Sequence, residues 1–142
     1  MIERPDAIVC DLDGVLYRGD VGIDGAGEAL AALHQAGIEI VFVTNNSTKA
    51  PAEAAAKITR LTGFEAHERD VVTSAQAAAH VLAADAPPTL LFGAAGARLP
   101  LEHESVPIVS DWQDARAVVA GLDLSLTYES LTRAVMAVER GA

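Results

Sequence analysis

Two carboxylates and a glycine stand close together near the start of the chain. Asp11 and Asp13 are separated by one residue, and Gly14 follows the second acid directly. Carboxylates this close repel each other, so their pKa values can be driven apart, which leaves one ionised as a nucleophile and the other able to carry a proton. A divalent cation would relieve the same repulsion. A solvated turn after a strand is the alternative interpretation of these residues.

Both acids follow an apolar segment of strand length, residues 7–10, so the strand ends on a charged and tightly turning loop. A second apolar segment, residues 38–43, ends in a polar run made of Thr44, Asn45, Asn46 and Ser47. Between the two segments, apolar residues recur at helical spacing, which predicts a helix. The strand, the helix and the second strand would together form a βαβ unit. We expect the strand at residues 38–43 to be covered on both faces, as parallel strands usually are. Ligands bind beyond the carboxyl ends of such strands, where both polar runs lie.

The helices of this first part have predictable ends. Asp24 is expected to cap a helix that runs to about Gln35, and Ser47 or Thr48 is expected to cap the next helix. A short strand at residues 71–73 and a third helix follow. Three basic side chains are expected on a solvated face: Lys49, Lys57 and Arg60.

A second α/β part follows a Pro-Pro pair. Residues 85–88 interrupt the third helix, and a new strand pattern begins at residue 89. Strands and helices alternate up to a last helix at residues 127–139, in which Leu131, Val135 and Val138 supply an apolar face. The fold class is therefore α/β, and the pattern divides the chain into residues 1–84 and 85–142.

The composition disfavours several classes of partner. The 142 residues are 51% hydrophobic and 21% charged, as in globular domains, and their net charge is −10. That charge disfavours binding to nucleic acid or to an anionic membrane surface. The single cysteine, Cys10, allows no internal disulfide, and residues 1–9 lack the apolar core of a secretory signal. We therefore expect a cytoplasmic protein without a membrane span.

The polar runs resemble known motifs. The segment Asp-Leu-Asp-Gly-Val-Leu-Tyr at residues 11–17 is similar to the first motif of the haloacid dehalogenase (HAD) superfamily of phosphohydrolases, and residues 44–47 resemble its second motif. Together they are typical of the class IIA branch, which is related to 4-nitrophenylphosphatase and phosphoglycolate phosphatase. The resemblance implies a Rossmann-like HAD core with a parallel sheet, here residues 1–84. Residues 85–142 would begin the α/β cap inserted into that core, because residues 121–131 resemble a cap pattern.

The resemblance also implies roles for individual residues. Asp11 would attack the phosphoryl phosphorus to form an aspartyl-phosphate, and Asp13 would act as general acid and base. Mg²⁺ would be held by Asp11, by the backbone of Asp13 and by a further acid from a later motif. The phosphoryl group would be bound by Asp11, Leu12, Asp13, Thr44 and Asn45, with Gly14 and Asn46 flanking the entrance. From the residues themselves, a turn suits Asn46 equally well.

Two parts of the family pattern, a lysine motif and a late acidic pair, do not occur in this sequence. We therefore interpret the chain as part of a longer enzyme whose remaining segment supplies both, and we expect the 142 residues alone to be a poor catalyst. In the family's strand order, the strand at residues 7–10 would then have an unpaired edge. The alternatives are a catalytically incompetent remnant that binds phosphate or dimerises, and a receiver-like phosphoacceptor domain.

The remaining expectations concern partners. The substrate would be a small phosphorylated metabolite, and in this branch the cap selects it. The metabolite itself is not predictable from this sequence. A homodimer, if formed, would also use the cap.

Overall fold

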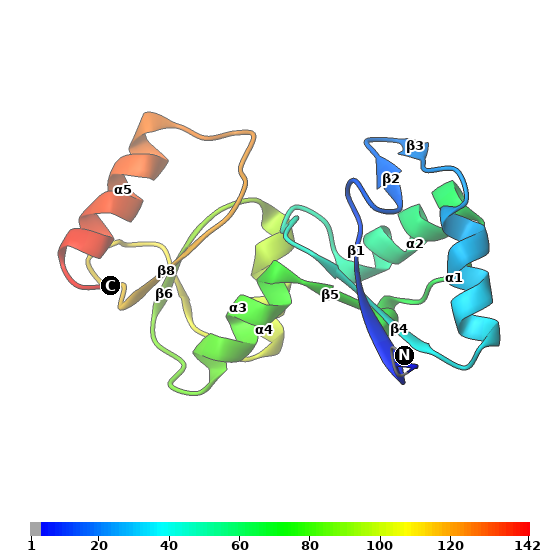
Figure 1. Ribbon diagram of the computed structural model, residues 1–142. Coiled ribbons are helices and arrows are strands. Elements are labelled where there is room, and N and C mark those ends of the chain that lie inside the picture. The colour runs from blue at the N-terminus through cyan, green and yellow to red at the C-terminus, as the bar shows by residue number, and fades with distance from the viewer. Residues whose placement is uncertain (1–3) are drawn as a thin grey trace. The chain divides into compact units, whose positions relative to one another are not determined.

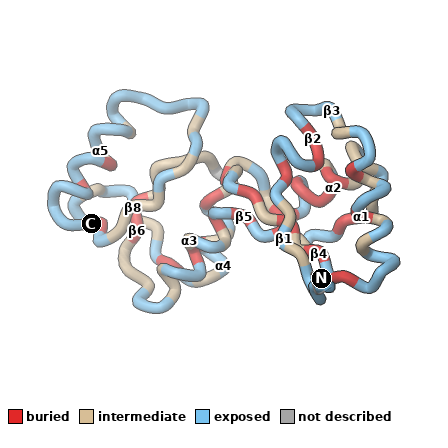
Figure 2. The backbone as a smooth tube through the Cα atoms, in the orientation of Figure 1, coloured by how far each residue is buried: buried red, intermediate tan, exposed pale blue. Residues whose placement is uncertain are grey.

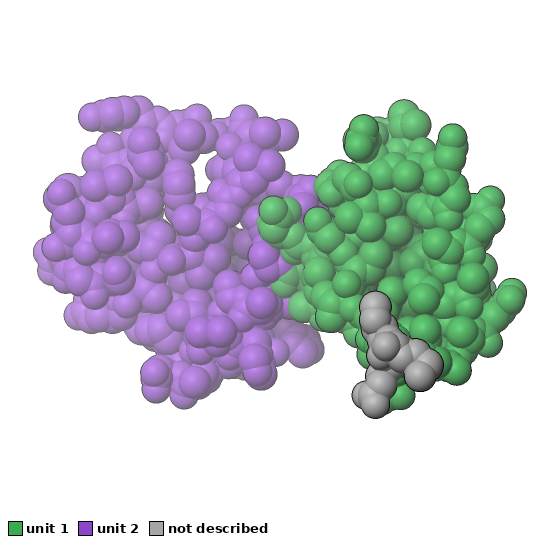
Figure 3. All heavy atoms as spheres, in the orientation of Figure 1, with its two compact units in different colours: residues 1–45, 50–73 green, residues 46–49, 74–142 purple. Residues whose placement is uncertain are grey.

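The computed structural model describes residues 4–142, which form two compact units (Figures 1 and 3). The first unit contains the residues up to Asn45 together with Ala50–Thr73, and the second contains Asn46–Lys49 together with Ser74–Ala142. Each unit has its own three-stranded parallel sheet. The α/β class with parallel sheets is thus confirmed.

The first unit alternates strands and helices, as predicted. Its elements are β1 (Ala7–Asp11), β2 (Tyr17–Arg18), β3 (Val21–Gly22), α1 (Ala26–Gln35), β4 (Glu39–Thr44), α2 (Pro51–Thr62), the short 3₁₀ helix η1 (Glu68–Asp70) and β5 (Val71–Thr73). The parallel sheet has the order β1-β4-β5, and β2 pairs with β3 in a small antiparallel hairpin. Within the described residues β1 is therefore an edge strand, as expected from the family's strand order.

The core of the first unit lies on one face of its sheet. Figure 2 shows buried segments in the strands of this sheet and in α1 and α2. Phe42 of β4 is buried in one cluster with Leu30 of α1 and Ile58 of α2. On the opposite face Val9 is 72% exposed and Val72 is 41% exposed. The expectation that β4 is covered on both faces is therefore not met by the described residues, because α1 and α2 pack on the same side.

The first helix begins without the predicted cap. The residue before α1 is Gly25, which has a left-handed backbone (φ 81°), and no side chain caps the helix. Asp24 lies one residue further from the helix, so the prediction that it caps α1 is wrong. Glycine readily adopts a left-handed backbone conformation, and at this point that conformation turns the chain sharply into the helix.

The second helix is also capped by a different residue from the predicted ones. Ala50 precedes α2, and its backbone N–H donates a hydrogen bond to Glu53 Oε2 at 3.0 Å. Pro51 occupies the first turn, where its missing N–H costs nothing. The glutamate therefore satisfies the helix start, and the hydroxyl residues at 47 and 48 lie before it.

The second unit repeats the alternation with a smaller sheet. Its elements are α3 (Ser74–Ala83), β6 (Thr89–Phe92), the 3₁₀ helix η2 (Ala95–Ala97), α4 (Arg98–His103), β7 (Ile108–Val109), β8 (Ala117–Ala120) and α5 (Tyr128–Glu139). The strand order is β7-β6-β8. Helices pack on both faces, since Leu91 of β6 clusters with α3 and α4, whereas Leu90 clusters with α5. No helix among residues 4–142 is long and apolar enough to cross a membrane.

The third helix belongs to the second unit. Ala79 of α3 is buried with Leu101 of α4 and Val106. The compact units consequently part between Thr73 and Ser74, whereas the sequence pattern places its division between residues 84 and 85. The Pro-Pro pair ends a helix inside the second unit.

The last helix presents a different face to its sheet from the predicted one. Ala134 and Ala137 are buried, whereas Leu131, Val135 and Val138 are 41%, 47% and 55% exposed. The small alanine side chains line the sheet-facing side of α5, and the larger apolar ones lie outside that contact. The predicted start is confirmed, because Thr127 accepts a hydrogen bond from the Ser130 backbone N–H at 3.1 Å.

Candidate functional site

Parallel pairing brings the ends of β1 and β4 together at one edge of the first sheet. Asp11, the last residue of β1, is in register with Val43, and the next residue is Thr44. Neighbouring strands in a sheet lie about 4.8 Å apart. Asp11 is exposed and Thr44 is buried at this edge, so a carboxylate and a hydroxyl residue occupy adjacent strand ends.

The turn after β1 is anchored by the side chain of Leu12, which is 1% exposed. Its carbonyl oxygen accepts the backbone N–H of Leu16 at 2.9 Å, and the Gly14 N–H donates to the Tyr17 carbonyl at 2.7 Å. Gly14 has φ +86°, which only glycine adopts without strain. Asp13 remains exposed on this tightly hydrogen-bonded turn.

The first acid is oriented by its own turn. The Leu12 backbone N–H donates to Asp11 Oδ1 at 2.8 Å. This hydrogen bond fixes the carboxylate relative to the strand end. It also means that the amide of Leu12, expected to bind a phosphoryl oxygen, already has an acceptor.

Tyr17 begins the β2–β3 hairpin that follows the two acids, and it is not among the predicted catalytic, phosphate-binding or metal-binding residues. Its side chain is 3% exposed, and burial, followed by the negative charges of Asp13 and Asp11, raises its pKa to about 12. Lys57 of α2 places its Nζ 4.0 Å from the centre of the tyrosine ring. The expectation that Lys57 lies on a solvated face is therefore wrong. Its spacing from Tyr17 in the sequence gave no sign of this contact.

The two asparagines after β4 differ in their surroundings. Asn45 is exposed and belongs to the first unit, directly after Thr44. Asn46 belongs to the second unit, and its Oδ1 accepts hydrogen bonds from the Thr48 backbone N–H at 2.9 Å and from the Thr48 hydroxyl at 2.6 Å. Asn46 thus closes a turn, which was one of its two interpretations.

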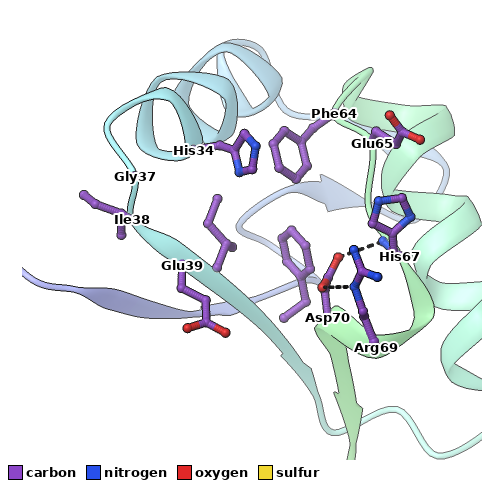
Figure 4. A pocket seen from close by; sticks show the side chains of 11 residues that line it. His34, Gly37, Ile38, Glu39, Phe64, Glu65, His67, Arg69 and Asp70 are labelled. Atoms are coloured by element: carbon purple, nitrogen blue, oxygen red, sulfur yellow. Dashed lines mark hydrogen bonds and ion pairs between the residues drawn. The ribbon is translucent and has the colours of Figure 1, made fainter.

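A cavity of about 530 Å³ lies at the opposite ends of the strands (Figure 4). Its apolar floor includes Phe42 and Phe64, and Phe64 meets the ring of His34 edge to face at 6.0 Å. At its rim Asp70 accepts the His67 backbone N–H and pairs with Arg69. None of the predicted site residues lines this cavity, so it is not the predicted phosphate pocket.

Within residues 4–142, no group of three or more histidine, cysteine, aspartate or glutamate side chains is arranged to hold a metal ion. The turn after β1 offers the oxygen atoms of Asp11 and Asp13. Mg²⁺ commonly takes one or two carboxylates and retains several waters, so this donor set suits part of a magnesium site. A complete site would take further ligands.

Residues 8–106 match the family model of haloacid dehalogenase-like hydrolases. Among curated proteins, the chain is 38% identical over 138 residues to the acid sugar phosphatase of Staphylococcus saprophyticus, a match that covers 96% of this chain and 52% of that protein. The acid sugar phosphatase of Staphylococcus aureus is 36% identical over the same length. The chain spans about half the length of these curated relatives.

Solved structures of phosphatases also resemble this chain. A glycerol phosphate phosphatase from Mycobacterium tuberculosis in complex with magnesium superposes with a TM-score of 0.88 at 33% identity, covering 97% of this chain and 42% of that one. A thermostable NPPase mutant from Geobacillus stearothermophilus gives 0.87 at 33% identity, covering 99% and 55%. The arrangement of strands and helices described above is therefore that of the corresponding part of these phosphatases.

Proposed function

Because this chain belongs to the haloacid dehalogenase-like hydrolases, we propose that it forms part of a phosphatase that hydrolyses a small-molecule phosphomonoester through an aspartyl-phosphate. The observation that carries the proposal is the register of β1 with β4. It puts Asp11 next to the strand end that bears Thr44, at the carboxyl edge where α/β sheets bind ligands. The phosphatases among its relatives support the same reaction class.

In this proposal Asp11 is the nucleophile and Asp13 the acid and base. A carboxylate oxygen of Asp11 bonds to phosphorus while the bond from phosphorus to the leaving oxygen breaks, and Asp13 donates a proton to that oxygen. Water then attacks the aspartyl-phosphate, Asp13 accepts its proton, and inorganic phosphate departs. The hydrogen bond from the Leu12 amide to Asp11 Oδ1 supports this role, because it holds the carboxylate in place.

The phosphoryl oxygens are assigned to donors on both strand ends. The hydroxyl of Thr44 and the backbone N–H of Asn45 are proposed as donors after β4, and the backbone N–H of Asp13 as the donor after β1, because the Leu12 N–H is engaged by Asp11 Oδ1. Gly14 would flank the entrance, where its lack of a side chain leaves room. Nothing lies within 4 Å of a Cβ built on Gly14, which fits that role.

Mg²⁺ is the proposed cofactor. The carboxylate of Asp11 and the backbone carbonyl of Asp13 would hold it, together with water and an acid from outside the described residues. When bound, Mg²⁺ offsets the negative charge of the phosphoryl group and of the nucleophile. The magnesium complex of the Mycobacterium tuberculosis phosphatase supports this choice.

We also propose how the chain fits into the complete enzyme. Residues 1–84 would contribute to the core and residues 85–142 would begin the cap, while the remaining segment would supply a lysine and a late acidic pair. The cap would select the metabolite and mediate any homodimer. The exposed Leu131, Val135 and Val138 of α5 support self-association of this part. The cytoplasm is the proposed compartment.

Hydrolysis of 4-nitrophenyl phosphate by the full-length protein tests the assignment. Asp11→Asn is expected to lower kcat by at least about 10³-fold and to abolish acid-stable labelling by phosphate, because no nucleophile remains. Asp13→Asn is expected to lower kcat by about 10² to 10⁴-fold. Asp85→Asn, which removes an exposed carboxylate, serves as the matched control. Turnover by Asp11→Asn at the wild-type rate would overturn the proposal.

A catalytically incompetent, phosphate-binding remnant is the second candidate. Within residues 4–142 no three-residue metal cluster occurs, and the remnant differs from the first candidate in that no further segment completes one. Mixing the purified chain with the missing segment of a relative distinguishes the two. Recovery of turnover that depends on Asp11 supports the phosphatase, whereas phosphate binding without turnover supports the remnant.

A further inference from the structure

The β2–β3 hairpin is held against α2 at three points. Lys57 Nζ lies 4.0 Å from the centre of the Tyr17 ring, and Arg60 pairs with Asp20 at 3.4 Å. At Gly22, an added Cβ would collide with a backbone carbonyl oxygen of α2. The hairpin that follows the nucleophile is therefore fastened to a helix that begins beyond β4 (Figure 1).

These contacts differ in strength. The side chains of Arg60 and Asp20 are 60% and 81% exposed, and exposed ion pairs contribute little. Lys57 is half-buried, and the ring beneath it is 3% exposed. A cation over a desolvated ring is held more firmly than one over an exposed ring. The contact of Lys57 with the Tyr17 ring is therefore the principal polar interaction that holds the hairpin against α2.

The fastened residue also shapes the turn that carries the proposed general acid. The Tyr17 carbonyl accepts the Gly14 N–H at 2.7 Å, and Tyr17 forms an isolated β-bridge with Asp13. Any shift of Tyr17 therefore moves the backbone of Asp13 and Gly14. Leu12, at the other end of the turn, is fixed by burial.

We propose that Lys57 is a positioning residue for Asp13, acting through the ring and backbone of Tyr17. The inference rests on the proposed function, in which Asp13 moves protons to and from the reacting oxygens. Lys57 itself need not touch substrate. Its positive charge holds the ring, the ring fixes the turn, and the turn holds the acid at its working distance.

The proposal predicts a defect in proton donation rather than in binding. A poor leaving group depends on the general acid more than a good one does, so Lys57→Met in the full-length enzyme should lower kcat for phenyl phosphate about tenfold and kcat for 4-nitrophenyl phosphate much less. KM should change by less than about twofold. Lys57→Arg should restore both rates, because a guanidinium also stacks on an aromatic ring.

The matched control is Arg69→Gln. Arg69 is 81% exposed and pairs with Asp70, so its loss removes one positive charge from the same unit without touching the hairpin. This variant should keep wild-type kcat for both substrates. Equal losses on both substrates in Lys57→Met, or failure of Lys57→Arg to restore activity, would overturn the inference.

Hydrogen exchange separates this inference from the proposed function. In Lys57→Met, the amide of Gly14 should exchange at least about threefold faster than in the wild type and in Arg69→Gln, because its acceptor on Tyr17 is released. This measurement needs no activity. Unchanged exchange at Gly14 in Lys57→Met overturns the positioning role even in an active enzyme. Faster exchange at Gly14 in Lys57→Met, together with turnover that persists in Asp11→Asn, supports the contact between Lys57 and the hairpin and refutes the aspartyl-phosphate mechanism.

Discussion

The phenol of Tyr17 is placed where ionisation is disfavoured. It is buried, and the charges of Asp13 and Asp11 act on it, so its pKa rises from 10.0 to about 12. Because the neutral phenol is favoured in the folded state, this contribution to stability is complete below about pH 10 and is lost as the pH rises through about 12. The burial that raises the pKa also makes the ring a firm support for Lys57.

Replacing Tyr17 by phenylalanine should therefore reduce the alkaline loss of stability. Between about pH 9 and pH 11.5 the free energy of unfolding of the wild type should fall by up to about 2 kcal/mol more than that of Tyr17→Phe. Urea unfolding at the two pH values measures the difference. Tyr128→Phe, which alters a tyrosine that is 87% exposed, is the control and should behave as the wild type does. Parallel losses in wild type and Tyr17→Phe would contradict the pKa shift.

Whether the place of a single residue could be predicted depended on how far apart in the sequence its contacting residues lie. Asp11, Asp13 and Thr44 follow apolar strands directly, so local sequence was enough to place them at strand ends. The pairing of Lys57 with Tyr17 joins residues from different elements, and no local pattern encodes it. Their positions as a candidate site follow from the register of β1 with β4, which required the structure.

At the level of elements, successive side chains of β1 lie in two different environments, the core and the exposed face of the sheet. Ile8 faces the core formed with α1 and α2, whereas Val9 points to the opposite face and is 72% exposed. Adjacent side chains in a strand point to opposite faces of the sheet. The two positions therefore form a matched pair within one strand.

Lysine at these two positions should have opposite consequences in the isolated 142-residue chain. Ile8→Lys should destabilise it by about 3 kcal/mol or more, because a charge enters the core. Val9→Lys should change stability by less than about 0.5 kcal/mol and should raise solubility, because a charged edge strand resists pairing with other chains. Thermal unfolding and light scattering test both variants. A strong destabilisation by Val9→Lys would show that this face is packed.

Helix positions were predicted better than helix faces and caps. Apolar spacing located α1, α2, α3 and α5 to within a few residues. It failed for the orientation of α5, because Ala134 and Ala137 can approach the sheet more closely than the larger Leu131 can. Such a choice between two stripes on one helix depends on the sheet beneath it, which local sequence does not describe.

At the level of the whole molecule, the described residues contain only part of the proposed chemistry. Both proposed acids lie in the first unit, and no three-residue metal cluster occurs within residues 4–142. The chain spans about half the length of its curated relatives. The proposed lysine and late acids would have to come from elsewhere.

The 142-residue chain alone should consequently hydrolyse 4-nitrophenyl phosphate at least about 10²-fold more slowly than the full-length protein. Removing one donor to the reacting group typically costs about 10² to 10³ in rate, and loss of a metal ligand adds to that. Steady-state assays with Mg²⁺ on both proteins measure the ratio. Comparable rates would show that the chain contains a complete site.

The bare face of the first sheet also bears on how the protein is made. Within residues 4–142 the three strands of that sheet all precede Ser74, so this part of the ladder can close while later residues are still inside the ribosome. The valines at positions 9 and 72 would then face solvent during translation. A nascent chain in this state exposes an apolar face, so we expect a chaperone that shields apolar surface to raise its soluble yield, even though these 142 residues carry a net charge of −10.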